Sequence, residues 1–422
     1  MENVVMKTLK CFYIFTSLAL CITFRSQAQI APFLLLTSSS EGNGMAGISG
    51  SVQTDNAMST LANPGQLGLL TLDHYLVAGA STTESNWEPD YYPISDLTYY
   101  TYAVNAGINL NQFTKLPLGV SIGFGYSKQS LNFEAILHDE LGPPISIPTN
   151  ESSENLHFGI GFEYVVKIGL GYTVKFVDTD LPIHSKFSTY DLGMIMTVPM
   201  FGIISKLQDH PVIFGNNIEP MFDITFGYAK KNLGDYVNAY YNESIALPRT
   251  LLLGVSWKAG FIIHTSSQSW EILSFTIARE AEDLLVKPLF DSAGNQISDP
   301  KYIDGNGDIV FFRNVIAGEW GGKITLRRGW QANIGEFFYM SGGSSDGPDL
   351  QYSTLGYGIR LSGILKTIQS LHSSIAESEV FKFLINHVDI RFDHSVENNV
   401  EEYNYISTRN GTNYSGLNFV LN

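Results

Sequence analysis

The feature that most constrains the fold is a two-residue alternation of side-chain type, first clear in YYTYAVNAGINL at residues 99–110. Even-numbered positions from Tyr100 to Leu110 are apolar, whereas the odd-numbered positions between them carry small side chains. Successive side chains of a β-strand point to opposite faces, so a period of two predicts a strand. The alternation leaves open whether the apolar face meets a protein core or lipid.

The same alternation recurs along the chain and predicts about 14 strands. Clear examples lie at residues 116–127, 156–166, 170–176, 190–194, 222–228, 251–257, 273–277, 355–361 and 388–392. Weaker examples lie near Tyr75, Ile316, Ile324 and Phe419. Few segments have helical spacing, so the chain is predicted to be all-β.

Charge and glycine content favour lipid on the apolar side of these strands. Charged residues make up 16% of the chain, against roughly 25% in soluble domains, and 39 residues are Gly. We expect the strand charges on the small-residue face and none on the apolar face: Glu163, Lys175, Asp191, Asp223, Lys258, Glu280, Arg360, Asp389 and Arg391. Glycine weakens a strand unless the backbone is crowded, as at barrel bends or against a plug.

These observations predict a transmembrane antiparallel β-barrel over residues 71–422, with small and charged residues lining the lumen. A soluble propeller is one alternative, but it requires a sequence repeat of about 40 to 45 residues, which the chain lacks. A large soluble sandwich is the other. The net charge of −16 makes a nucleic-acid partner improbable.

The two ends of the chain are consistent with this prediction. Residues 1–28 have basic, apolar and small-residue regions in the order of a secretory signal peptide. Both cysteines, Cys11 and Cys21, lie inside it, so the mature chain is expected to lack disulfides and thiol chemistry. The last residues, SGLNFVLN, predict a final strand and resemble the C-terminal assembly signal of outer-membrane barrels.

Two regions interrupt the strand rhythm. Residues 29–70 are rich in Gly, Ser and Asn and precede the first strand, so they are predicted to fold into the lumen as a plug, with Asp55 capping a short helix that Pro64 ends. Residues 362–385 carry Ile364, Ile368 and Leu371 at helical spacing. They predict a loop helix that either rests on the membrane surface or only packs on the barrel.

Motifs that could carry chemistry are weak. The pattern GVSIG at residues 119–123 matches a nucleophile elbow around Ser121, with His157 on a nearby strand, but it lies within an alternating strand rather than at a strained turn. We therefore expect no catalytic residues. Asp304, Asn306 and Asp308 are spaced like the start of a calcium loop without its closing Glu, so an acidic turn is the favoured interpretation.

Several segments resemble one known family. The region PFLLLTSSSEGNGMAGISGSVQTDNAMSTLANPGQLG, with its Gly-Met-x-Gly turn and Asn-Pro pair, resembles the start of the PorV and PorQ group. These are FadL-like outer-membrane barrels of Bacteroidota. The segments YDLGMIM, LPRTLLLGVSW, AGEW, LRRGW and TLGYGIRL follow in the order expected for that group.

The resemblance implies a 14-stranded barrel with an N-terminal plug whose residues include Gly44, Met45, Gly47, Asn63 and Pro64. Its implied role is non-enzymatic handling of secreted proteins in type IX secretion or surface attachment. The partners would be outer-membrane lipid, C-terminal signal domains of cargo and secretion-machine subunits. The alternative is FadL-like passage of small hydrophobic molecules. No cofactor is expected, and lumen-facing pairs such as Glu163 with Lys175 could line a path or tie the wall to the plug.

Overall fold

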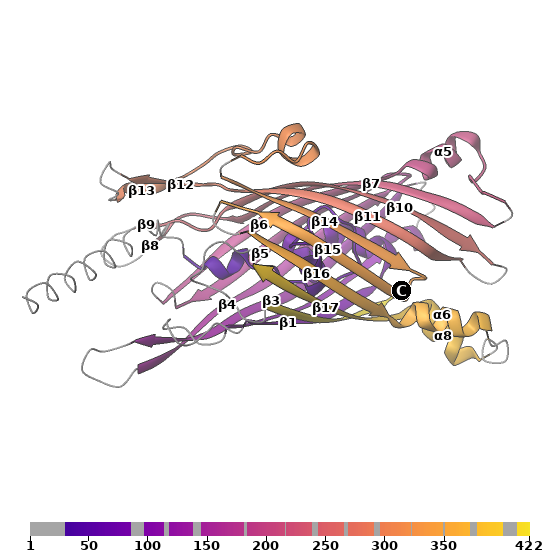
Figure 1. Ribbon diagram of the computed structural model, residues 1–422, viewed down its shortest axis with the longest axis horizontal. Coiled ribbons are helices and arrows are strands. Elements are labelled where there is room, and N and C mark those ends of the chain that lie inside the picture. The colour runs from indigo at the N-terminus through magenta and orange to yellow at the C-terminus, as the bar shows by residue number, and fades with distance from the viewer. Residues whose placement is uncertain are drawn as a thin grey trace, which may run out of the picture.

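The computed structural model describes residues 30–85, 97–113, 118–137, 145–180, 184–215, 217–238, 244–265, 269–290, 296–321, 323–348, 351–371, 378–399 and 412–422. The predicted signal peptide lies outside these residues. Fourteen antiparallel strands form one closed barrel, as predicted, and β1 pairs with β18 to close it (Figure 1). The predicted strand near Ile316 is wrong, because residues 311–316 form a short π-helix, whereas the barrel strand at residues 338–346 was not predicted.

The barrel strands follow one another around the wall in chain order. They are β1 (Leu76–Ser85), β2 (Leu97–Asn109), β3 (Gly119–Leu137), β4 (Ile145–Glu163), β5 (Lys167–Thr179), β6 (Ser185–Pro199), β7 (Ile218–Leu233), β10 (Thr250–His264), β11 (Ser269–Leu284), β14 (Ile324–Ile334), β15 (Phe338–Asp346), β16 (Gln351–Arg360), β17 (Val388–Asn399) and β18 (Thr412–Leu421). Two small hairpins stand outside the wall: β8 (Val237–Asn238) with β9 (Ser244–Ile245), and β12 (Val286–Phe290) with β13 (Gln296–Tyr302).

Strand β2 shows which way each face points. Tyr102 and Val104 are 43% and 45% exposed, whereas Ala103 between them and Thr101 and Asn105 on either side are almost fully buried. Exposed apolar side chains recur around the wall, and a closed barrel leaves no unpaired strand edge. In lipid every backbone polar group must be paired within the protein, which a closed barrel achieves. The chain therefore spans the outer membrane with its apolar face toward lipid.

The two ends of the barrel differ in their connections. One end, here the terminus end, carries the C-terminus, the three-residue turns 164–166 and 335–337, and the helices α5 (Met200–Gln208), α6 (Leu361–Leu371) and α8 (Glu379–His387) (Figure 1). The other, the loop end, carries the two small hairpins. Barrels of this class have short periplasmic turns and longer external loops, so the terminus end faces the periplasm.

The predicted loop helix at residues 362–385 takes a different form. It is two helices, α6 and α8, and residues 372–377 between them lie outside the described residues. No described helix has the length and apolar character needed to cross a membrane.

Residues 30–74, which we call the plug, fold inside the barrel as η1 (Pro32–Leu35), α2 (Ser40–Gly44), α3 (Ser59–Ala62) and α4 (Gln66–Asp73) (Figure 1). Helix α4 packs on β3, β4 and β5, while α2 packs on β16 and β17. The expectation that Asp55 caps a helix is wrong. Helix α3 has Met58 at its N-cap without a side-chain hydrogen bond, and Asp55 instead pairs with arginines of the wall.

The expectation that no strand charge lies on the apolar face is also wrong. On β11, Arg279 and Asp283 lie on the same face as the exposed Phe275 and Ile277. On β14, Arg328 lies on the same face as Leu326. These three charged residues therefore point outward. They are tolerated because the connection between β11 and β14 folds back over this part of the wall and supplies polar partners.

Candidate functional site: the plug and its attachment to the wall

The plug backbone lies against glycines of the wall. A Cβ atom at Gly171 of β5 would overlap the Pro64 backbone and lie 2.7 Å from Gly65 N. A Cβ atom at Gly159 of β4 would lie 2.8 Å from Gly68 N. Such distances are too short for a side chain, so glycine in these strands provides the space that the plug occupies.

The predicted plug residues contact the wall at three places. Asn63 Nδ2 donates to Met194 O at 2.9 Å and to Gly50 O at 2.8 Å, so it joins β6 to another part of the plug. Gly44 lies close to Ser341 of β15, and Met45 packs with Ile48 against Ala278. Gly47 has a φ of 85°, a conformation that favours glycine, and lies beside Arg327.

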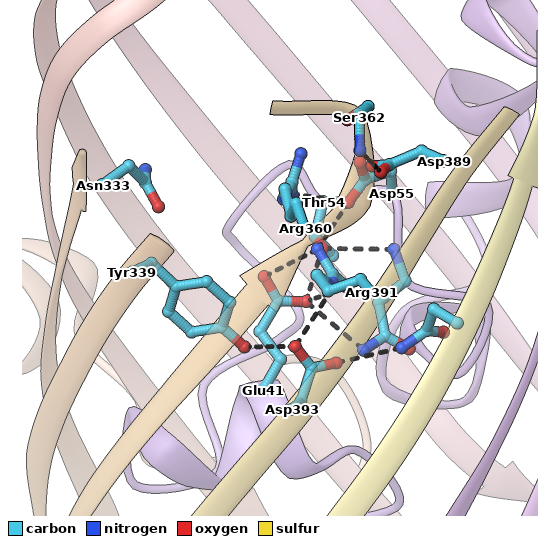
Figure 2. Close-up of polar contacts among 12 residues, drawn as sticks. Glu41, Thr54, Asp55, Asn333, Tyr339, Arg360, Ser362, Asp389, Arg391 and Asp393 are labelled. Atoms are coloured by element: carbon cyan, nitrogen blue, oxygen red, sulfur yellow. Dashed lines mark hydrogen bonds and ion pairs between the residues drawn. The ribbon is translucent and has the colours of Figure 1, made fainter. Parts of the chain in front are cut away.

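A cluster of buried charges joins the plug to β16 and β17. Arg391 of β17 has Nη2 2.7 Å from Glu41 Oε2 and Nη1 2.6 Å from Asp55 Oδ1, and its side chain is 2% exposed. Arg360 of β16 has Nη2 3.0 Å from the same Asp55 oxygen. We call Glu41, Asp55, Arg360, Arg391 and Asp393 the plug–wall ion cluster; Figure 2 shows Arg391 at its centre.

Neutral groups complete the cluster. Tyr339 OH donates to Asp393 Oδ1 at 2.6 Å, and Asn418 Nδ2 donates to Asp393 Oδ2 at 3.0 Å. On the plug side, Thr54 Oγ1 donates to Glu41 Oε2 at 2.8 Å. Buried charges are tolerated when they are both paired and hydrogen-bonded, and each carboxylate here has at least two partners.

The two arginines of the cluster change the pKa of Asp55. Burial by itself would raise its pKa, but Arg360 and Arg391 outweigh burial and hold the pKa well below its usual range. Asp55 is therefore ionised in the closed plug at all physiological pH values. The cluster thus acts as an electrostatic attachment between residues 41–55 and the wall.

Among the other predicted lumen charges, Glu280 of β11 accepts hydrogen bonds from Ser51 N and Ser51 Oγ of the plug, at 2.7 and 2.8 Å. Others form pairs within the wall or near the periplasmic end. Lys175 Nζ lies 2.7 Å from Asp191 Oδ2, and both residues are almost completely buried. The suggested pairing of Glu163 with Lys175 is wrong, because the β4–β5 register sets Glu163 opposite Lys167, whose Nζ lies 3.6 Å from it.

The two remaining lumen charges of this group lie toward the terminus end. Lys258 Nζ lies 2.7 Å from Glu271 Oε2. Asp223 lies opposite Lys258 in the β7–β10 register. Neither residue takes part in the plug–wall ion cluster.

The residues considered for hydrolysis are not arranged as a catalytic pair. Ser121 Oγ donates to Gly68 O at 2.9 Å and contacts Thr71, so it binds the plug. His157 instead contacts Ser127 Oγ through Nε2 and Thr173 Oγ1 through Nδ1, both at 2.8 Å. Ser121, Ser127 and His157 are all fully buried.

The calcium-loop candidates lie in an exposed turn. Asp308 N donates to Asp283 Oδ2 at 2.6 Å, which ties the turn to β11. Within the described part of the chain, no group of three or more His, Cys, Asp or Glu side chains could hold a metal ion.

A small cavity lies where the plug meets the half of the wall near the loop end. Its volume is about 30 Å³. Plug residues 34–39, Met58 and Leu61 form one side. The wall side includes Gln129, Lys175, Lys231, Leu252, Glu282 and Arg327. A cavity of this size holds about one water molecule, whereas pockets for small molecules are usually about 300–1,000 Å³.

Sequence reasoning placed Arg391 on the lumen face but did not identify it, Glu41 or Asp393 as parts of one site. Strand parity was the only signal available for Arg391. Its partners are 336 and 350 residues away along the chain, and no local pattern connects them.

Comparison with known proteins gives similarity of structure alone. No protein-family model matches the chain, and no curated protein matches its sequence. The Pseudomonas putida toluene transporter TodX is 8% identical, covering 94% of this chain and 98% of that one, with a TM-score of 0.41. A Pseudomonas aeruginosa FadL homologue is 10% identical, covering 93% and 98%, with a TM-score of 0.37. The CymD monoaromatic hydrocarbon channel is 9% identical, covering 94% and 97%, with a TM-score of 0.33.

Proposed function

We propose that this barrel conveys small, mainly apolar molecules across the outer membrane, without chemical conversion, along a path between the plug and the wall. The observation that carries the proposal is the cavity at the plug–wall junction. Plug residues form one side of it, so its size depends on where the plug lies. Apolar Leu34, Met58, Leu61 and Leu252 contribute to its lining, and polar or charged side chains, among them Lys175, Lys231, Glu282 and Arg327, form the rest.

The proposal requires the plug to move. The cavity now admits about one water molecule, so a larger molecule passes only after the plug has shifted away from the wall. The plug–wall ion cluster opposes that shift, because separating it would expose or unpair several buried charges.

A disulfide that locks the plug tests this requirement directly. A Cβ atom built at Gly44 lies 3.6 Å from Cβ of Ser341, within the range of about 3.5–4.5 Å that disulfides need. The variant carrying Gly44→Cys and Ser341→Cys, with Cys11 and Cys21 replaced by Ala, would join the plug to β15 when oxidised. Reduction of the same sample is the matched control.

Uptake is measured in cells with an intact asymmetric outer membrane, because apolar molecules cross simple lipid vesicles unaided. The probe is radiolabelled toluene, with a labelled disaccharide for comparison. We expect faster toluene uptake than in the empty host, a return to background on oxidation, and recovery on reduction. Equal toluene uptake with the disulfide formed and reduced, or no gain over the empty host, would contradict the proposal.

A second candidate is the handling of secreted proteins at the cell surface, as the PorV and PorQ resemblance implies. The observation that favours it is a packed aromatic cluster at the loop end. Tyr302 stacks on Tyr236 with ring centroids 4.5 Å apart, and Arg249 lies 3.7 Å over the Tyr302 ring. These contacts hold two long connections together, which would make a firm platform for a protein partner needing about 800 Å² of surface.

Affinity purification from the native outer membrane followed by mass spectrometry tests this candidate. Recovery of secreted proteins that share a C-terminal domain, or of secretion-machine subunits, would support it. The Tyr302→Ala variant should then lose these partners, whereas Tyr357→Ala, on the lipid-facing side of β16, should keep them. Recovery of the barrel alone would exclude a stable complex.

A further inference from the structure

Residues 303–321, which we call the strap, lie on the outside of the barrel wall. Ile309 and Val315 of the strap pack with Leu251 and Val255 of β10 and with Leu326 of β14. These wall residues belong to the outward, apolar face of their strands. In Figure 1 the orange coil that follows β13 runs back along the outside of the wall from the loop end.

The strap also satisfies the outward-pointing charges of the wall. Arg279 donates to Ile316 O, and Arg328 Nη2 donates to Gly318 O at 2.9 Å. Asp283 accepts from Asp308 N at 2.6 Å. These charges interrupt the apolar face of the wall, and the strap supplies their hydrogen-bond partners. Residues of β11 and β14 therefore specify the position of the strap on the wall.

Strand register connects the covered part of the wall to the exposed apolar side chains of the outer face, which we call the lipid-facing belt. Leu253, under the strap, pairs in register with Tyr228 of β7, which pairs in turn with Met194 of β6. Met194 is exposed on the outer face and belongs to that belt. The strap therefore occupies a place on the wall where lipid would otherwise be.

The far side of the strap presents apolar side chains. Phe312 is 77% exposed, Val310 53% and Trp320 52%. Arg313 and Glu319 lie beside them, with Arg313 Nε 3.8 Å from Glu319 Oε2. A Trp beside a charged pair is typical of the membrane interface, where the aromatic ring lies near the headgroups and charged ends reach water.

We propose that residues 309–321 of the strap form a membrane-embedded segment at the outer-leaflet interface, with Val310, Phe312 and Trp320 inserted among lipid acyl chains, while the acidic turn at residues 304–308 lies in water. Continuity with the lipid-facing belt identifies lipid as the occupant of this surface. Paired Arg313 and Glu319 set its depth near the headgroups. The strap thus replaces lipid against β10, β11 and β14 and presents its own apolar surface to the bilayer.

Site-directed spin labelling tests the position of the strap. Single cysteines are placed at Phe312→Cys on the strap, Ile277→Cys on the bare wall and Asn306→Cys in the exposed turn, with Cys11 and Cys21 replaced by Ala. The full barrel is reconstituted in vesicles of phosphatidylethanolamine and phosphatidylglycerol. Collision of each label with oxygen, which concentrates in acyl chains, is compared with collision with a water-soluble nickel chelate.

We expect the Phe312 label to resemble the Ile277 label, with high oxygen and low nickel accessibility, and the Asn306 label to show the reverse. A Phe312 label that is accessible to nickel would place the strap in water and overturn the proposal. Low accessibility to both reagents would also overturn it, because a second copy of the chain would then cover the surface.

A measurement without cysteines provides an independent check. Trp320 in the unmodified chain should be quenched by lipids brominated near the headgroup end of the acyl chains. The Trp320→Phe variant should lose that quenched component while keeping those of the wall tryptophans. An unquenched Trp320 signal in a barrel that resists unfolding would contradict the proposal.

Discussion

Replacement of Arg391 by Met should release the plug without unfolding the barrel. Arg391 pairs with two plug carboxylates, Glu41 at 2.7 Å and Asp55 at 2.6 Å, in a site that is 2% exposed. After the change, Asp55 keeps Arg360 at 3.0 Å, but Glu41 keeps only neutral donors such as Thr54. Removing one partner of a buried ion pair costs about 3–5 kcal/mol, so the free energy that closes the plug should fall by that amount.

The Arg360→Met variant is the matched comparison. The Arg360 side chain forms an ion pair with Asp55, and the two side chains are 28% and 19% exposed. In the Arg360→Met variant, Arg391 still pairs with Asp55. The cost for such a partly exposed pair should be about 1 kcal/mol. The difference between the variants, about 3 kcal/mol, corresponds to roughly a hundredfold in an equilibrium constant.

Native-state hydrogen exchange measures this equilibrium at each amide. We expect protection of amides in residues 56–62 to fall by roughly two to three orders of magnitude in Arg391→Met and by tenfold or less in Arg360→Met. Amides of β3 and β4 should stay protected in both. Equal losses in plug and wall would show that Arg391 stabilises the whole barrel, and unchanged plug protection would show that the cluster does not hold the plug; either result refutes the reasoning.

Three further predictions concern the space for the plug, a buried ion pair of the wall and the titration of Asp55. Gly171→Val should displace the plug, because the valine side chain would overlap the Pro64 backbone at a cost of at least about 1–3 kcal/mol. Plug amides should then lose protection from hydrogen exchange, whereas Gly202→Ala on α5 should leave that protection unchanged. Lys175→Met should lower the urea midpoint of barrel unfolding, because it leaves Asp191 buried without its ion-pair partner and so lowers the free energy of unfolding by about 3–5 kcal/mol. Lys186→Met breaks an exposed pair and should lower that free energy by under about 1 kcal/mol. The closed plug lowers the pKa of Asp55, so the contribution of Asp55 to closure is complete above its ordinary pKa of 3.8 and declines as the pH falls below that value. Conductance in planar bilayers should therefore rise on acidification. A wild-type response in Asp55→Asn would contradict this assignment.

The barrel itself could be predicted from local pattern. A period of two specifies a strand, and Gly, Ser and Thr on one face with aromatic residues on the other specify which face meets lipid. Strands such as β2 and β4 needed no tertiary information for this, because each residue's face follows from its parity. The plug was predictable because residues 29–70 precede the first strand, and the many glycines on the inner face are consistent with a crowded lumen.

Pairing of charges could not be predicted in the same way. Parity correctly sets Glu163 and Lys175 on one face, but pairing depends on strand register, which sets Glu163 opposite Lys167. A β-bulge between β6 and β7 then brings Asn232 to Asp191, the partner of Lys175. A one-residue irregularity of this kind leaves no trace in the alternation.

The sequence by itself thus determined most of the strands, the face of each residue in them and the presence of a segment before the first strand, because these depend on neighbours within a few residues. It missed β15 and placed a strand near Ile316, where the structure has a short π-helix. Only the tertiary structure decided that Arg391 meets Glu41 and Asp55, and that residues 303–321 cover charges on the outer wall. Those contacts join segments far apart in the chain. They arise because barrel closure brings β17 beside the plug and because buried or lipid-facing charges must find partners wherever the fold offers them.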